Sequence, residues 1–138
     1  YIDIHDNTVF INENQFLWTS EKDGYNHLYL IDYKAKKEIQ LTSGKWEVTK
    51  MYGYSANEKT IFFQAAKKTP TDREVYSLNI DSKKIQLLSN SSGTNDASFS
   101  SNYNYFINTH SDANNPFIIT LNDNKGKLLK VLEDNKSY

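Results

Sequence analysis

A pattern of short β-strand candidates, in groups of four, recurs along the chain at a nearly constant spacing. Equivalent apolar positions at Leu28, Val75 and Phe117 are 47 and 42 residues apart. A second set of positions, in the last strand of each group, is 46 and 43 residues apart. Four-stranded units that repeat every 40–50 residues or so are typical of β-propeller blades. A plain β-sandwich remains the alternative, although it requires no such period.

The first unit shows the pattern most clearly. Residues 16–20, 27–32 and 39–42 are rich in aromatic and aliphatic β-formers, and a weaker strand is expected at 8–11. A polar turn that contains Gly24 separates the first two of these strands. The remaining expected strands are 48–54, 60–65, 74–80, 84–88, 97–100, 103–108, 117–122 and 127–132.

Three blades are too few to close a ring. The units span approximately residues 8–46, 47–88 and 96–135, whereas closed propellers use roughly four to eight blades. The sequence therefore predicts an all-β fold, a partial β-propeller of about three four-stranded antiparallel blades that is not a closed ring. Such a piece exposes apolar blade faces at both ends, so we expect homo-oligomers that pair through these edges.

The stacking of blades predicts which strands are buried and which are exposed. Inner strands packed on both sides should be continuous apolar runs, as residues 61–63 and 117–119 are. The outermost strand should be half exposed and should alternate, as residues 39–42 do.

Composition excludes several functions. The formal net charge is −1, which does not indicate a nucleic-acid or anionic-membrane partner. The chain contains no Cys, so a disulfide framework, a thiolate metal site and a Cys nucleophile are excluded. No apolar run approaches the ~20 residues needed to span a bilayer. No metal-ligand cluster or Gly-rich phosphate loop is present, and we expect no cofactor and no metal.

Four motifs, in order, resemble those of the dipeptidyl peptidase IV family. Residues 18–29, WTSEKDGYNHLY, are similar to its W-x-S-E-x-D-G-x-x-H-L-Y run. Residues 40–48, QLTSGKWEV, resemble Q-L-T-x-G-x-W-x-V, and residues 72–76, DREVY, resemble a blade motif. Residues 132–135, LEDN, resemble the sequence found where the family's propeller ends. The resemblance covers approximately residues 14–135.

The resemblance implies a serine exopeptidase that releases Xaa-Pro or Xaa-Ala dipeptides from peptide N-termini. Family members carry an N-terminal eight-bladed propeller followed by an α/β-hydrolase domain, and usually work as homodimers. It implies that residues 1–138 are the last blades of that propeller, a non-catalytic part that limits access to the active site. It also suggests an exported or periplasmic protein, and the Lys- and Asn-rich composition favours a bacterial source.

No catalytic residue is assigned. Ser55 lies in a segment that looks superficially like the family's nucleophile elbow, but Asn57 replaces the second Gly and no helix pattern follows. We expect Ser55 to open a turn between strands. His5, His27 and His110 could be placed in a Ser-His-Asp triad only on paper, and we expect His27 to form a hydrogen bond within the turn after Gly24.

The paired carboxylates Glu21 and Asp23 leave a second function open. Some propellers hydrolyse glycosides with two carboxylates, although satisfying a tight turn is the simpler role for this pair. A propeller glycosidase and a stand-alone interaction scaffold are therefore the alternatives to the peptidase interpretation. The family's double-Glu motif has no counterpart here, and no residue near 1–8 matches its substrate-facing loop, so the substrate-binding residues are unknown.

The remaining conspicuous residues have structural explanations. Trp18 and Trp46 are expected in the core, and residues 72–74 at a salt-bridged strand entrance. Asn90 and Asn135 begin glycosylation sequons, which would matter only in a secreted eukaryotic protein.

Overall fold

The protein is built from β-strands throughout the part that the structure describes. The computed structural model describes residues 8–89, 92–114 and 117–133. Within these ranges there are twelve strands, and no helix is long and apolar enough to cross a membrane. The strands are β1 Val9–Phe10, β2 Gln15–Ser20, β3 His27–Asp32, β4 Lys37–Gln40, β5 Glu47–Ser55, β6 Thr60–Ala66, β7 Glu74–Asn79, β8 Ile85–Leu87, β9 Thr94–Phe99, β10 Tyr105–Ser111, β11 Ile118–Asp123 and β12 Leu128–Glu133.

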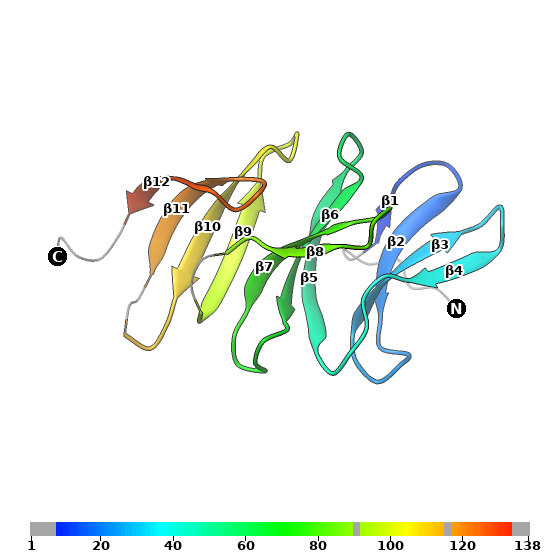
Figure 1. Cartoon of the computed structure of the whole chain (residues 1–138), viewed down its shortest axis with the longest axis horizontal. Coiled ribbons are helices and arrows are strands. Elements are labelled where there is room, and N and C mark those ends of the chain that lie inside the picture. Colours follow the sequence, from blue (N-terminus) through cyan, green and yellow to red (C-terminus); the bar gives the residue numbers. More distant parts are fainter. Residues whose placement is uncertain (1–7, 90–91, 115–116, 134–138) are drawn as a thin grey trace.

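The strands form three separate four-stranded antiparallel sheets, each in chain order (Figure 1). We call β1–β4 the first sheet, β5–β8 the middle sheet and β9–β12 the third sheet. They follow one another along the long axis of the molecule, with the middle sheet between the other two (Figure 1). No sheet is closed. The predicted fold class, an open stack of about three four-stranded blades, is confirmed.

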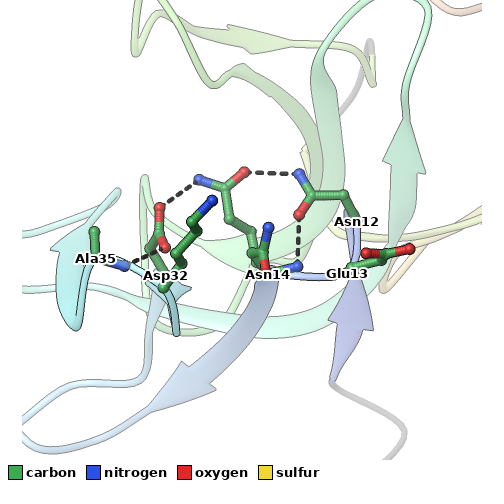
Figure 2. A pocket seen from close by; sticks show the side chains of 7 residues that line it. Asn12, Glu13, Asn14, Asp32 and Ala35 are labelled. Carbon is green, nitrogen blue, oxygen red and sulfur yellow. Dashed lines mark hydrogen bonds between the residues drawn. The ribbon is translucent and has the colours of Figure 1, made fainter.

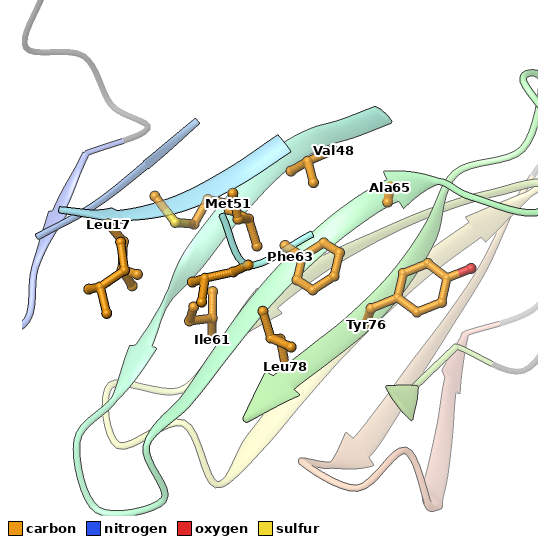
Figure 3. Packing of buried hydrophobic residues seen from close by; sticks show 11 residues of the cluster. Leu17, Val48, Met51, Ile61, Phe63, Ala65, Tyr76 and Leu78 are labelled. Carbon is orange, nitrogen blue, oxygen red and sulfur yellow. The ribbon is translucent and has the colours of Figure 1, made fainter. Parts of the chain in front are cut away.

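The middle sheet is buried on both faces. Side chains alternate along a strand, so Ile61, Phe63 and Ala65 of β6 face the first sheet, whereas Phe62 faces the third. The first-sheet side of this core is shown in Figure 3, where Leu17 lies across from Ile61 and Phe63. This two-sided burial explains the continuous apolar run in β6.

The core between the middle and third sheets is largely aromatic. Phe62 lies 4.6 Å from Phe99 between ring centroids, and Phe99 lies 4.9 Å from Phe106. Tyr103 stacks on Phe62 at 5.7 Å. Gly53 makes this approach possible, because a Cβ at its positive φ of 153° would overlap the Tyr103 ring.

A polar group joins the innermost strands of the same two sheets. The Tyr52 hydroxyl donates to Asp96 Oδ1 at 2.7 Å and accepts from the Ala97 N–H at 3.0 Å. Lys50 Nζ contacts the same carboxylate at 3.1 Å. Burial, followed by the Asp96 hydrogen bond, raises the pKa of Tyr52 far above its ordinary range, so the hydroxyl keeps its proton.

Two expectations about strand burial were wrong, one for an outermost strand and one for an inner strand. The strand expected at 39–42 is β4, which ends at Gln40 and is exposed at every residue rather than alternating. The chain leaves the edge there because Leu41 and Thr42 turn into the core. The apolar run 117–119 is not buried on both sides either: Phe117 precedes β11 and is exposed, and Ile118 and Ile119 are only half-buried.

The start of β10 also differs from the expected strand at 103–108. Tyr103 has a φ of 59° and its N–H donates to the Ser100 carbonyl, so residues 100–103 form a turn. The strand begins two residues later, at Tyr105, and continues to Ser111.

Because the middle sheet is buried on both faces, an Ile→Val substitution there should lower the free energy of unfolding more than the same substitution on an exposed face of the third sheet. Ile61→Val should lower the free energy of unfolding by about 0.5–1.5 kcal/mol, because a fully buried methyl group is lost. Ile107→Val makes the same change at a side chain that is 41% exposed on the third sheet. Urea denaturation should show a much smaller loss for Ile107→Val, and equal losses would contradict the burial of Ile61 between the first and middle sheets.

Candidate functional site

His27 is fully buried and connects β3 to the segment that follows β4. Its Nε2 lies 2.9 Å from the Gly44 carbonyl oxygen, and its Nδ1 lies 2.8 Å from Thr42 Oγ1. A carbonyl can only accept, so Nε2 carries the hydrogen, and in the neutral ring Nδ1 accepts from the Thr42 hydroxyl. Thr42 Oγ1 in turn accepts from the Leu28 N–H at 3.0 Å. The expectation of a hydrogen bond within the turn after Gly24 was wrong.

The Trp46 ring closes this arrangement from the side. It meets the His27 ring edge-on, with centroids 4.9 Å apart and planes at 86°. Trp46 is half-buried and packs against the core between the first and middle sheets, as expected, and Trp18 is also half-buried. Gly44, with a φ of 119°, holds its backbone against the Trp46 indole, where a Cβ would come within 2.8 Å of Nε1.

The two motifs, residues 18–29 and 40–48, contact each other in the structure, and we call them together the motif unit. Gln40 Nε2 donates to Asp23 Oδ2 at 2.6 Å and to the Thr42 carbonyl at 2.9 Å. Asn26 exchanges two hydrogen bonds with Val48, one through its side chain at 2.7 Å and one through its carbonyl at 2.8 Å. These hydrogen bonds tie turns and strand ends of the motif unit together, and the Asn26–Val48 pair connects the first sheet to the middle sheet.

Glu21 and Asp23 occupy the turn between β2 and β3. The Glu21 carbonyl accepts from the Gly24 N–H at 2.9 Å, and Asp23 accepts from Gln40 and from the Tyr25 N–H. The Gln40 hydrogen bond is the main cause that lowers the pKa of Asp23. Glycoside hydrolysis needs one carboxylic acid with a raised pKa, which Asp23 does not supply.

The other catalytic candidates also have structural partners. Ser55 is the last residue of β5, opposite Thr60, and leads into the turn at 56–59, where the sequence predicted one. His110 Nε2 lies 2.6 Å from the Ser92 carbonyl oxygen. His5 lies outside the described residues, as do both sequon asparagines, Asn90 and Asn135.

The entrance of β7 is arranged differently from the expectation for residues 72–74. Arg73 donates to the carbonyls of Pro70 and Asp72 rather than to a carboxylate. The ion pair of this segment joins Lys68 Nζ to the buried Glu74 at 3.6 Å. The partner thus comes from the preceding loop, which no spacing in the sequence indicated.

Two surface depressions were not predicted. One, of about 570 Å³, lies between the β1–β2 and β3–β4 turns (Figure 2). Its polar groups bind one another: Gln15 accepts from Asn12 at 2.9 Å and donates to Asp32 at 3.1 Å. The other, of about 190 Å³, has Trp46 in its wall, with Lys67 Nζ 5.5 Å from the indole centroid. Both are formed by turns from different strands, a proximity that sequence spacing does not give.

The described residues contain no group of three or more His, Asp or Glu side chains placed to hold a metal ion. By its fold and by the connectors between its sheets, the described chain is a set of propeller blades.

Comparison with known proteins places these blades in a family. The family model described as the dipeptidyl peptidase IV (DPP IV) N-terminal region matches residues 1–117. The chain belongs to the dipeptidyl peptidase IV family and lies in its N-terminal region. The resemblance seen in the motifs is thereby confirmed.

Relatives are similar over most of this chain but are much longer. The crystal structure of Porphyromonas gingivalis dipeptidyl peptidase 4 is 42% identical, with a TM-score of 0.86, over 95% of this chain and 18% of that one. A probable dipeptidyl-aminopeptidase B from Arthroderma otae is 33% identical over 121 residues, which cover 83% of this chain and 13% of that protein. A putative dipeptidyl aminopeptidase IV from Bacteroides ovatus, 24% identical with a TM-score of 0.80, supports the fold alone.

The His27 arrangement predicts a specific cost for removing one hydroxyl. Thr42→Val should destabilise the chain by about 1–3 kcal/mol, because the buried Leu28 N–H and His27 Nδ1 lose their partner. Thr42→Ser keeps the hydroxyl and should recover most of the loss in chemical denaturation. If Val and Ser cost the same, the hydroxyl is not the connector.

The hydrogen bond from Gln40 to Asp23 predicts that the pKa of Asp23 will rise when Gln40 is replaced. Gln40→Met should raise the pKa of Asp23 toward its ordinary value of 3.8, as followed by carboxyl ¹³C NMR. A carboxylate whose folded pKa is lowered contributes stability above its unfolded pKa and loses it as pH falls through the folded pKa. Gln86→Met, at the outer strand of the middle sheet, is the control and should leave Asp23 unchanged. A pKa that does not move in Gln40→Met would rule out this cause.

Proposed function

We propose that this chain is the non-catalytic propeller portion of a dipeptidyl peptidase IV-like serine exopeptidase that releases Xaa-Pro or Xaa-Ala dipeptides. The observation that carries the proposal is the match to the family's N-terminal region, together with 42% identity to a dipeptidyl peptidase 4 of known structure. The chain spans only 13–18% of the length of that enzyme and of the fungal relative. The peptidase activity is therefore a proposal for the whole protein, with catalysis in a hydrolase domain outside these blades.

The role of the blades in this proposal is to wall off the active site and to admit only short peptides. Support comes from how the described side chains are used. His27 and His110 are buried and hydrogen-bonded to backbone or turn groups, and Ser55 lies at a strand end. Rigid sheets cross-linked by such contacts suit a barrier.

The two alternatives have less support. A propeller glycosidase needs the Glu21 and Asp23 pair as acid and base, but both lie in one tight turn, in which Asp23 accepts hydrogen bonds from Gln40 and the Tyr25 N–H. A stand-alone interaction scaffold would use the same blades without a hydrolase domain. The length of the relatives favours a longer enzyme over such a scaffold.

We also propose an exported or periplasmic bacterial setting. The Porphyromonas gingivalis structure supports a bacterial source, whereas the curated relatives with 32–36% identity are fungal. Export follows from the family resemblance.

The proposed division of labour can be tested with the purified chain and with a chimera. Residues 1–138 alone should release no chromophore from a Gly-Pro chromogenic substrate, with Porphyromonas gingivalis dipeptidyl peptidase 4 as the positive control. Replacing the matching segment of that enzyme with this chain should retain Gly-Pro hydrolysis, because the blades should fit the same ring. Hydrolysis by the isolated chain, or a folded but inactive chimera, would contradict the proposal.

Open blade faces should drive association of the isolated chain. Phe10 and Tyr33 on the first sheet, and Tyr105 and Ile107 on the third, are 41–59% exposed. Covering such apolar faces favours the assembly of copies. Light scattering should show a mass that rises with concentration, and a monodisperse monomer at high concentration would count against this expectation.

A further inference from the structure

A cavity of about 210 Å³ lies between the middle and third sheets, beyond their aromatic core. Three amide side chains, Asn95, Asn108 and Asn122, line it, and so do three aliphatic side chains, Ile118, Leu128 and Val131. Among the described residues that form its wall, none is Lys, Arg, Asp or Glu. Apart from His110, the described wall is therefore polar without an ionisable side chain.

The orientation of the central amide is fixed by a chain of hydrogen bonds. Asn95 Nδ2 donates to the Arg73 carbonyl at 3.1 Å, and a carbonyl can only accept. Asn95 Oδ1 therefore accepts from Asn108 Nδ2, at 3.0 Å. The amide of Asn108 cannot be flipped without placing two oxygens together, so its Oδ1 is an acceptor.

That acceptor has no hydrogen-bond partner in the part of the chain that the structure describes. Asn108 is 6% exposed, so bulk water does not satisfy it. Buried acceptors almost always have a donor. The cavity thus calls for a hydrogen-bond donor.

The edge of the cavity toward β12 is aliphatic. The pairing of β11 with β12 places Leu128 beside Asn122 and Val131 beside Thr120, on the same face of the sheet. Both aliphatic side chains are 47% exposed. An occupant would meet C–H groups toward β12 and amide groups toward β9 and β10.

We propose that this cavity binds a small neutral polyol, of monosaccharide size, with one of its hydroxyl groups donating to Asn108 Oδ1. The volume holds roughly seven waters at about 30 Å³ each, which matches one sugar ring. A sugar ring offers a C–H face and several hydroxyl donors, whereas a charged ligand would find no Lys, Arg, Asp or Glu partner in the described wall. Water could also donate an O–H hydrogen bond to Asn108 Oδ1, and the experiment distinguishes a bound sugar from bound water.

The test is a titration of the ¹⁵N-labelled chain followed through its side-chain amide signals. D-glucose, D-galactose and N-acetylglucosamine are added separately into the millimolar range, with sodium acetate as a charged comparison. Saturable shifts of the Asn95 and Asn108 amide signals with at least one sugar, and none with acetate, are expected. If no sugar gives a saturable shift, the cavity holds water alone and the proposal is overturned.

Substitutions in and beside the cavity test whether the sugar binds there. Asn108→Leu removes the acceptor and should weaken binding by about tenfold or more, the factor that one hydrogen bond supplies. Thr109→Leu is the matched control, because Thr109 is exposed on the other face of β10 and should leave binding unchanged. Val131→Trp fills the cavity from a half-exposed edge and should abolish binding in a folded chain, even if Asn108→Leu does not fold. Sugar binding that survives Val131→Trp would overturn the proposal.

Discussion

Burial of both faces of one sheet is the constraint on which the rest of the structure depends. The middle sheet places Ile61 and Phe63 against the first sheet and Phe62 against the third. Neither outer sheet has such cover on both sides. A stack of this kind has no intrinsic end, which is why propellers close into rings and why three blades leave apolar faces exposed.

Polar groups determine how the blades are joined. The first and middle sheets are linked by the hydrogen bonds between Asn26 and Val48, whereas the middle and third sheets are linked through Tyr52 and Asp96. Asn26 and Val48 lie in the segments 18–29 and 40–48, which carry two of the family's sequence motifs. These two motifs thus describe how the first two blades are connected.

Much of the fold could be predicted from the sequence, because period, turn residues and β-formers act locally. The strands near 16–20, 27–32 and 60–65 and the four-strand unit were predicted for this reason. Burial at β4 and β11 could not be, because it depends on what covers each face. The partner of His27 lies 15 residues away at Thr42, and it could be found only by relating the two motifs to each other. The cavity beside Asn108 results from the stacking of two sheets, so no sequence pattern indicates it.

The central claim, that the middle sheet is held between two cores, is tested most directly by amide hydrogen exchange under native conditions. Exchange from local opening is slowest where burial is greatest. The account predicts that amides of β6 and β7 are the slowest in the described chain and that those of β11 and β12 exchange faster. Equal or greater protection in β11 and β12 would contradict it.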